Sequence, residues 1–147
     1  MLKMSAALIA AIACLASAPA MAQSNEYRQQ LDAQLQASRT QFQGEGYSVA
    51  AGPFTGALPA GGKERFTLPV EQGVSYKIVG ICDNDCTDVD MRVFNLNGEN
   101  IGEDVLDDDV PIVELQPTGT GTVQLEANMI ACSAEPCYHA IEVYWKR

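Results

Sequence analysis

The stretch VQLEANMIA, residues 123–131, decides the fold class because an apolar residue stands at every second position. The apolar series consists of Val123, Leu125, Ala127, Met129 and Ala131. In a β-strand, every second side chain points to the same face, so this spacing predicts a strand with one buried face. Shorter segments with the same alternation occur at residues 66–68, 74–78, 89–93 and 141–145. A succession of short alternating strands predicts an all-β fold made of antiparallel sheet.

Turn-forming residues separate these segments. Asn97-Gly98 lies between two apolar segments and predicts a hairpin, since both residues tolerate a positive φ. Glycine-containing reversals are also predicted at residues 71–73 and 117–119, and residues 133–136 separate two further strands. Strands of this length and spacing favour an antiparallel β-sandwich or jelly-roll-like domain over a parallel fold.

The N-terminal residues 1–22 have the order of a secretory signal peptide. The basic residue Lys3 is followed by an apolar run over residues 6–15 and by the small-residue site Ala20-Met21-Ala22. We predict cleavage after Ala22 and export to the periplasm or the exterior. A lipoprotein-type site at Cys14 is the weaker alternative, because the apolar run before it would be very short.

Residues 23–45 are predicted to form a helix or spacer that precedes the sandwich domain, residues 46–147. Tyr27, Leu31 and Leu35 recur every four residues, with Phe42 near the same face. This spacing predicts an amphipathic helix over residues 25–42, with Ser24 or Asn25 as N-cap and Gly44 beyond its end. Its narrow apolar stripe leaves two interpretations: the helix packs on the edge of the domain, or it stands apart as a spacer.

The charge of the chain argues against several classes of partner. Nineteen acidic residues against nine basic residues give a formal net charge of −10. Phosphate backbones and anionic lipid surfaces repel such a chain, so nucleic acid is not an expected partner. Membrane insertion is not expected either, because no apolar run reaches the ~20 residues of a membrane span. The oligomeric state is not encoded in any recognisable pattern.

Four cysteines follow the leader, namely Cys82, Cys86, Cys132 and Cys137. An even number in an exported chain indicates disulfides, and four cysteines allow three connectivities. We predict the two local pairs, Cys82–Cys86 and Cys132–Cys137, with the second stapling the base of a hairpin. Zinc is disfavoured, because these spacings are loose and an oxidising compartment does not favour free thiolates.

The stretch CDNDCTDVD, residues 82–90, and the acidic run at residues 103–109 raise the hypothesis of a calcium site. Calcium takes six to eight oxygen ligands, and two acidic loops at one end of a sandwich would supply them. The candidate ligands are Asp83, Asp85, Asp88, Asp90, Asp104, Asp107 and Asp108. The loop is not an EF-hand, because its glycine is missing and Phe94 stands at the position of the terminal glutamate. The alternative is a solvated turn shaped by side-chain hydrogen bonds of Asp83 and Asp85.

The sequence does not predict an enzyme. His139 is the only histidine and alternates with apolar residues of the last strand, and no nucleophile elbow or zinc-helix motif is present. We therefore predict no catalytic residues. The aromatic residues either fill the core or form an exposed platform for a sugar or a polypeptide; they are Tyr76, Phe94, Tyr138, Tyr144 and Trp145.

Three segments together resemble the bacterial pre-peptidase C-terminal domain, over about residues 54–144. They are LPVEQGVSYKIVG (68–80), DVDMRVFNLNG (88–98) and PTGTGTVQLEA (117–127). The resemblance implies a compact β-sandwich of the kind appended to secreted peptidases, some relatives of which bind calcium or polymeric substrates. The sequence departs from the family in having Val123 where the family has tyrosine, and no peptidase precedes the domain.

The expected function is that of an exported, non-catalytic binding or accessory protein of the cell envelope, stabilised by calcium if the acidic loops form a site. Its expected partner is an extracellular polymer or protein. Two alternatives stay open: a structural or stress-related periplasmic protein without a specific ligand, and a small secreted inhibitor of proteases.

Overall fold

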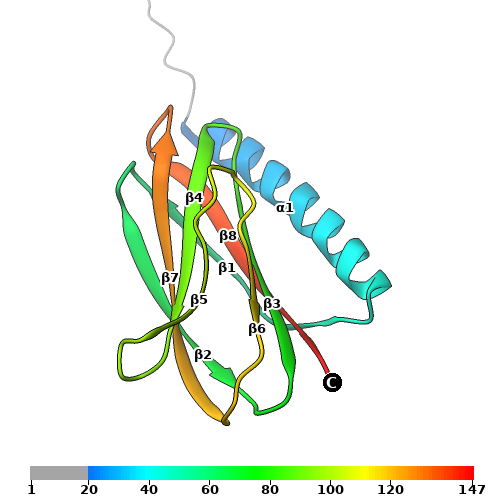
Figure 1. Cartoon of the computed structure of the whole chain (residues 1–147). Coiled ribbons are helices and arrows are strands. Elements are labelled where there is room, and N and C mark those ends of the chain that lie inside the picture. The colour runs from blue at the N-terminus through cyan, green and yellow to red at the C-terminus, as the bar shows by residue number, and fades with distance from the viewer. Residues whose placement is uncertain (1–19) are drawn as a thin grey trace, which may run out of the picture.

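The computed structural model describes residues 20–147, in one helix and eight strands (Figure 1). The elements are α1 (Ala20–Gly44), β1 (Ser48–Leu58), β2 (Lys63–Val70), β3 (Ser75–Cys82), β4 (Cys86–Phe94), β5 (Asn100–Asp104), β6 (Ile112–Leu115), β7 (Gly121–Cys132) and β8 (Cys137–Lys146). Most of the predicted leader, with Cys14, lies outside the described residues. The described part of α1 starts at Ala20, five residues before the predicted start of the helix, so Ser24 and Asn25 lie inside the helix and not at its N-terminus.

The strands form two antiparallel sheets of four that pack face to face. Sheet A has the order β1-β8-β3-β6, and sheet B has the order β2-β7-β4-β5. The chain changes sheet at almost every turn, which is the arrangement of a jelly roll. The predicted all-β sandwich is therefore confirmed. The predicted Asn97-Gly98 hairpin joins β4 to β5, and Gly98 adopts a φ of +82° there.

The main core lies between the sheets and follows from the alternation in the sequence. The inward side chains of β7, including Leu125 and Met129, are buried, as are Met91 and Val93 of β4. Sheet A contributes inward side chains from β3 and β8, including Ile78, Ile141 and Val143. One face of each central strand is thereby removed from water, which is the main source of stability in such a fold.

The α1 helix covers the outer face of sheet A (Figure 1). Its buried residues Leu31, Leu35 and Phe42 pack against outward side chains of β3 and β8, which are Val79, Ile81, Ala140 and Tyr144. The helix is therefore neither a free spacer nor confined to an edge of the domain. The packing of α1 on sheet A explains why β3 is apolar on both faces. Within residues 20–147, α1 has no apolar stretch of the kind that spans a membrane.

A buried ion pair fixes the helix to the sheet. Glu142 of β8 is 0% exposed and accepts hydrogen bonds from Arg39 of α1, at 2.9 Å from Nε to Oε2 and 2.5 Å from Nη2 to Oε1. The Tyr144 hydroxyl donates a further bond to Oε2 at 2.6 Å. Each Glu142 oxygen therefore has a partner, as a buried carboxylate requires.

The four cysteines lie in the two predicted pairs, at one end of the sandwich. Cα–Cα distances are 5.9 Å for Cys82–Cys86 and 5.8 Å for Cys132–Cys137. The predicted role of the second pair was wrong, because β7 belongs to sheet B and β8 to sheet A. Each disulfide joins the last residue of a strand in one sheet to the first residue of a strand in the other. They staple the sheets together and do not close a hairpin.

Candidate binding groove and acidic loops

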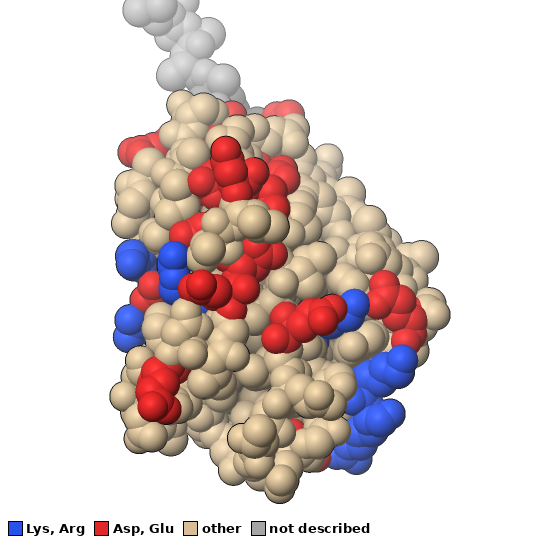
Figure 2. Space-filling model, viewed as in Figure 1, with Lys and Arg blue, Asp and Glu red and all other residues tan. Residues whose placement is uncertain are grey.

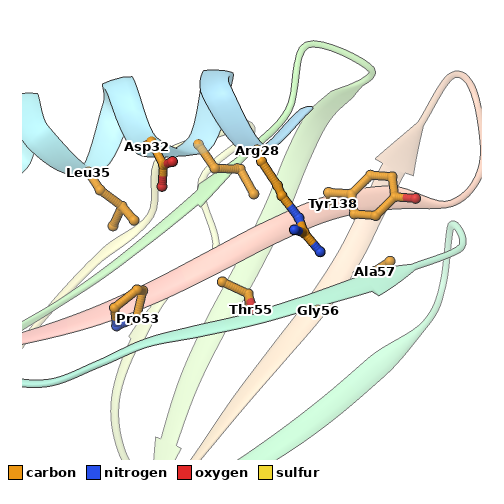
Figure 3. Close-up of a pocket in the computed structure, with 9 residues that line it drawn as sticks. Arg28, Asp32, Leu35, Pro53, Thr55, Gly56, Ala57 and Tyr138 are labelled. Carbon is orange, nitrogen blue, oxygen red and sulfur yellow. The ribbon is translucent and has the colours of Figure 1, made fainter. Parts of the chain in front are cut away.

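A groove of about 360 Å³ runs between α1 and strand β1 on the outer face of sheet A (Figure 3). The buried apolar stripe of α1 packs mainly on residues of β3 and β8. Because β1 is the edge strand, its outer face is left uncovered beside the helix. The residues that line the groove are Arg28, Leu31, Asp32, Leu35, Pro53, Thr55, Gly56, Ala57 and Tyr138.

Small side chains on β1 keep the groove open. Phe54 of β1 packs into the core between the sheets, so its alternating neighbours Thr55 and Ala57 point outward. Both are short and exposed. Leu31 and Leu35 form the opposite apolar wall, on the helix. The groove is therefore apolar along both sides.

Tyr138 of β8 lines the same groove and connects it to the turn between β3 and β4. Its ring stacks on that of Tyr27, with centroids 4.9 Å apart and planes at 20°. The Tyr27 hydroxyl donates to Asp85 Oδ2 at 3.0 Å, and this bond raises the pKa of the Tyr27 phenol. The first turns of the helix are thus held against the disulfide-linked turn.

Arg28 and Asp32 are the charged residues of the groove, one helical turn apart. In Figure 3 the Arg28 guanidinium extends from α1 toward β1. No hydrogen bond or ion pair joins Arg28 to a residue of the described chain. The spacing of Arg28, Leu31 and Leu35 places all three along one helix face, which is a clue the sequence carried. The sequence did not show that β1 would lie opposite.

A buried histidine lies behind the groove, on the inner face of sheet A. His139 is 1% exposed, its Nε2 contacts Glu64 of β2, and its Nδ1 has no partner among the described residues. Burial lowers the pKa of His139, although Glu64 and then Asp83 act to raise it. Gly56 makes room for the pair, because a Cβ there would lie 2.6 Å from Glu64 Oε1. With this burial, His139 offers a substrate no accessible lone pair.

Four of the candidate calcium ligands, Asp83, Asp85, Asp104 and Asp108, accept hydrogen bonds from the chain, and Asp108 Oδ1 accepts that of the Val110 N–H at 3.0 Å. Asp83 is buried and accepts the backbone N–H groups of Tyr138, at 2.8 Å, and Asp85, at 3.3 Å. Its burial raises the pKa of its carboxyl group. Asp85 accepts from Tyr27, and Asp104 accepts the N–H groups of Leu106 and Ile112. Only three of these bonds, from Asp85 to Asp83, from Leu106 to Asp104 and from Val110 to Asp108, join residues two apart as in the predicted turn. The others join residues farther apart in the chain, and Asp83 is buried and not solvated.

Asp88 lies near three other candidate ligands, Asp90, Asp107 and Asp108. The backbone N–H of Val89 donates to the carbonyl of Asp108 at 3.1 Å, which brings the loop of residues 105–110 against β4. Burial, followed by the charges of Asp90, Asp107 and Asp108, raises the pKa of Asp88. Figure 2 shows acidic side chains gathered on this part of the surface.

The carboxylates of Asp88 and Asp90 differ in whether a cation pairs with them. Asp88 Oδ1 is buried and has no hydrogen-bond partner in the described part of the chain, whereas Asp90 pairs with Arg92 at 3.2 Å. Within residues 20–147, no group of three or more His, Cys, Asp or Glu side chains has an arrangement that would hold a metal ion. Calcium binding stays a prediction.

The comparisons with known proteins assign no family. No family model matches the chain, and no curated protein matches it either. The resemblance to the pre-peptidase C-terminal domain therefore stays a prediction.

The five aromatic residues named above do not form one exposed platform. Tyr76 and Tyr144 are buried, Phe94 lies under the Arg65 guanidinium, and Trp145 lies under that of Arg147. Trp145 also borders a second cleft of about 350 Å³ at the open side of the sandwich, between β1 and β2. Of the five, only Tyr138 lines the groove beside α1.

Proposed function

We propose that the protein is an exported, non-catalytic binding protein of the cell envelope, and that the groove between α1 and β1 is its ligand site. The observation that carries the proposal is the groove itself. It has apolar walls on both sides and a volume of about 360 Å³. Ligand pockets in proteins have volumes of about 300–1,000 Å³ and similar linings. The leader pattern and the two disulfides support the exported location.

The groove is held open before a ligand arrives. On the helix side, Arg39 is bonded to Glu142, and Gln34 Nε2 donates to the Cys82 carbonyl at 2.8 Å. Gln30 accepts the backbone N–H of Asn84 at 3.1 Å. These bonds fix α1 along its length, so binding does not have to order the wall of the groove. A preformed site loses less entropy on binding, which favours affinity.

Nile red, a neutral apolar dye, tests the site. We expect saturable binding to the wild-type protein and its loss in Ala57→Trp, whose indole would fill the groove. Thr67→Trp is the control, because Thr67 is an exposed residue of β2 in sheet B. Thermal unfolding would establish that both variants are folded. Equal dye binding by wild type and Ala57→Trp would overturn the assignment of the groove, and no saturable binding at all would favour a protein without a specific ligand.

A further inference from the structure

We propose that the ligand of this groove is an unbranched apolar carboxylic acid whose carboxylate is bound by Arg28. This inference rests on the binding function proposed above and adds the chemical class of the ligand. Three features carry it: the lack of a partner for Arg28 among the described residues, its place at the apolar groove, and the pairing of the α1 and β8 backbones, which leaves only the free edge of β1 for a ligand amide.

Arg28 differs from all the other basic residues that the structure describes. Each of the others makes an ion pair or a hydrogen bond; they are Arg39, Lys63, Arg65, Lys77, Arg92, Lys146 and Arg147. The chain holds 19 acidic and 9 basic residues, so acidic partners are abundant. Among the described residues, the cation without a partner is the one that lines the groove.

Asp32 does not neutralise Arg28, although the two are four residues apart on α1. An arginine placed N-terminal to the acid is the less favourable order for such a helix pair. In Figure 3 the Arg28 side chain extends toward Thr55 and Gly56, away from the Asp32 carboxylate. A ligand carboxylate would meet the guanidinium on the β1 side, where its two oxygens could accept parallel N–H bonds. Asp32 would repel the same carboxylate, which fixes the direction of the ligand.

The rest of the groove suits a hydrocarbon chain better than a peptide. Its floor strand β8 is hydrogen-bonded to β1 on one side and to β3 on the other. The α1 backbone bonds within its own helix, and the only hydroxyl groups in the lining belong to Thr55 and Tyr138. A peptide could pair its amide groups with backbone only along the free edge of β1, and each amide buried without a partner would cost about 1–3 kcal/mol. A hydrocarbon chain carries no such groups and is stabilised by the apolar walls.

Displacement of Nile red by sodium decanoate, compared with decan-1-ol, tests the inference. In Arg28→Gln we expect decanoate to bind roughly three- to fivefold more weakly, the size of a partly exposed ion pair, with decan-1-ol unchanged. Arg28→Lys should restore part of the decanoate affinity. Arg147→Gln is the matched control, because it removes the same charge at the other end of β8, and it should bind decanoate as the wild type does.

The outcomes separate this inference from the proposed function. Suppose that Nile red binds in the groove but that Arg28→Gln weakens the binding of decanoate and of decan-1-ol equally, or weakens neither. The binding function then stands, and the assignment of a carboxylate ligand is wrong. Stronger displacement by decyltrimethylammonium would assign the site to a cation at Asp32. Stronger displacement by an apolar pentapeptide with a free C-terminus would assign it to a polypeptide. If Ala57→Trp leaves dye binding intact, both proposals fail.

Discussion

Replacing Arg39 with alanine should destabilise the protein by about 2 kcal/mol, because it leaves a buried carboxylate without its cation. Breaking a fully buried ion pair costs about 3–5 kcal/mol. Glu142 is 0% exposed, but the Arg39 side chain is 33% exposed, so water would reach the space left by the guanidinium. The hydroxyl of Tyr144 would remain as one neutral donor. Both features place the expected cost below the fully buried range.

Urea unfolding of the wild type and four variants would measure this cost. Glu142→Gln should cost less than Arg39→Ala, because a neutral amide needs no counter-charge and keeps the bond to Tyr144. The double variant should then be more stable than Arg39→Ala alone, so the two substitutions are not additive. Arg147→Ala is the control, since the Arg147–Glu71 pair is exposed, at 63% and 53%, and should contribute no more than about 1 kcal/mol. A loss in Arg39→Ala no larger than in Arg147→Ala would refute the reasoning.

Three other predictions concern the titration of His139, the charge of Asp88 and calcium. Burial holds the pKa of His139 below its ordinary 6.5, so the folded protein binds fewer protons than the unfolded chain. The free energy of unfolding should therefore fall as the pH drops below about 6.5. In urea titrations, His139→Gln should reduce this dependence of stability on pH between pH 7 and 5.5. Asp88→Asn should raise the stability at pH 7 by roughly 0.5 kcal/mol, since it removes one of several like charges. If calcium binds there, millimolar calcium should raise the melting temperature of the wild type more than that of Asp88→Asn, and a wild-type melting curve indifferent to calcium would exclude the site.

The strands could be predicted from the sequence because burial on one face leaves a period of two, as in residues 123–131. The alternation does not show to which of the two sheets a strand belongs. Residues 133–136 would separate two alternating segments in the same way whether the chain formed a hairpin or crossed from one sheet to the other. The prediction that Cys132–Cys137 staples a hairpin was wrong for this reason. The register and the partner of each strand depend on contacts distant in sequence, which a local pattern does not record.

The site was less predictable than the fold. Carboxylates could be counted in the sequence, but the N–H groups that occupy Asp83 and Asp104 come from other parts of the chain. The packing of α1 on sheet A could be predicted in part from the sequence. The strand β3 has a second apolar face at Val79 and Ile81, which must be buried against another element. Arg28 was missed, since the lack of a partner is a property of three-dimensional structure alone.

The position of β8 in sheet A also determines when the molecule can form. This strand is the last in the chain, yet it lies between β1 and β3 and carries Glu142, the anchor of the helix. Consider a chain that emerges N-terminus first, from a ribosome or through a membrane pore. It exposes β1, β3 and the apolar face of α1 before β8, which packs against all three, has emerged. The domain therefore closes only when β8 arrives, and a chain that lacks β8 would lose the centre of the sheet and not merely its edge.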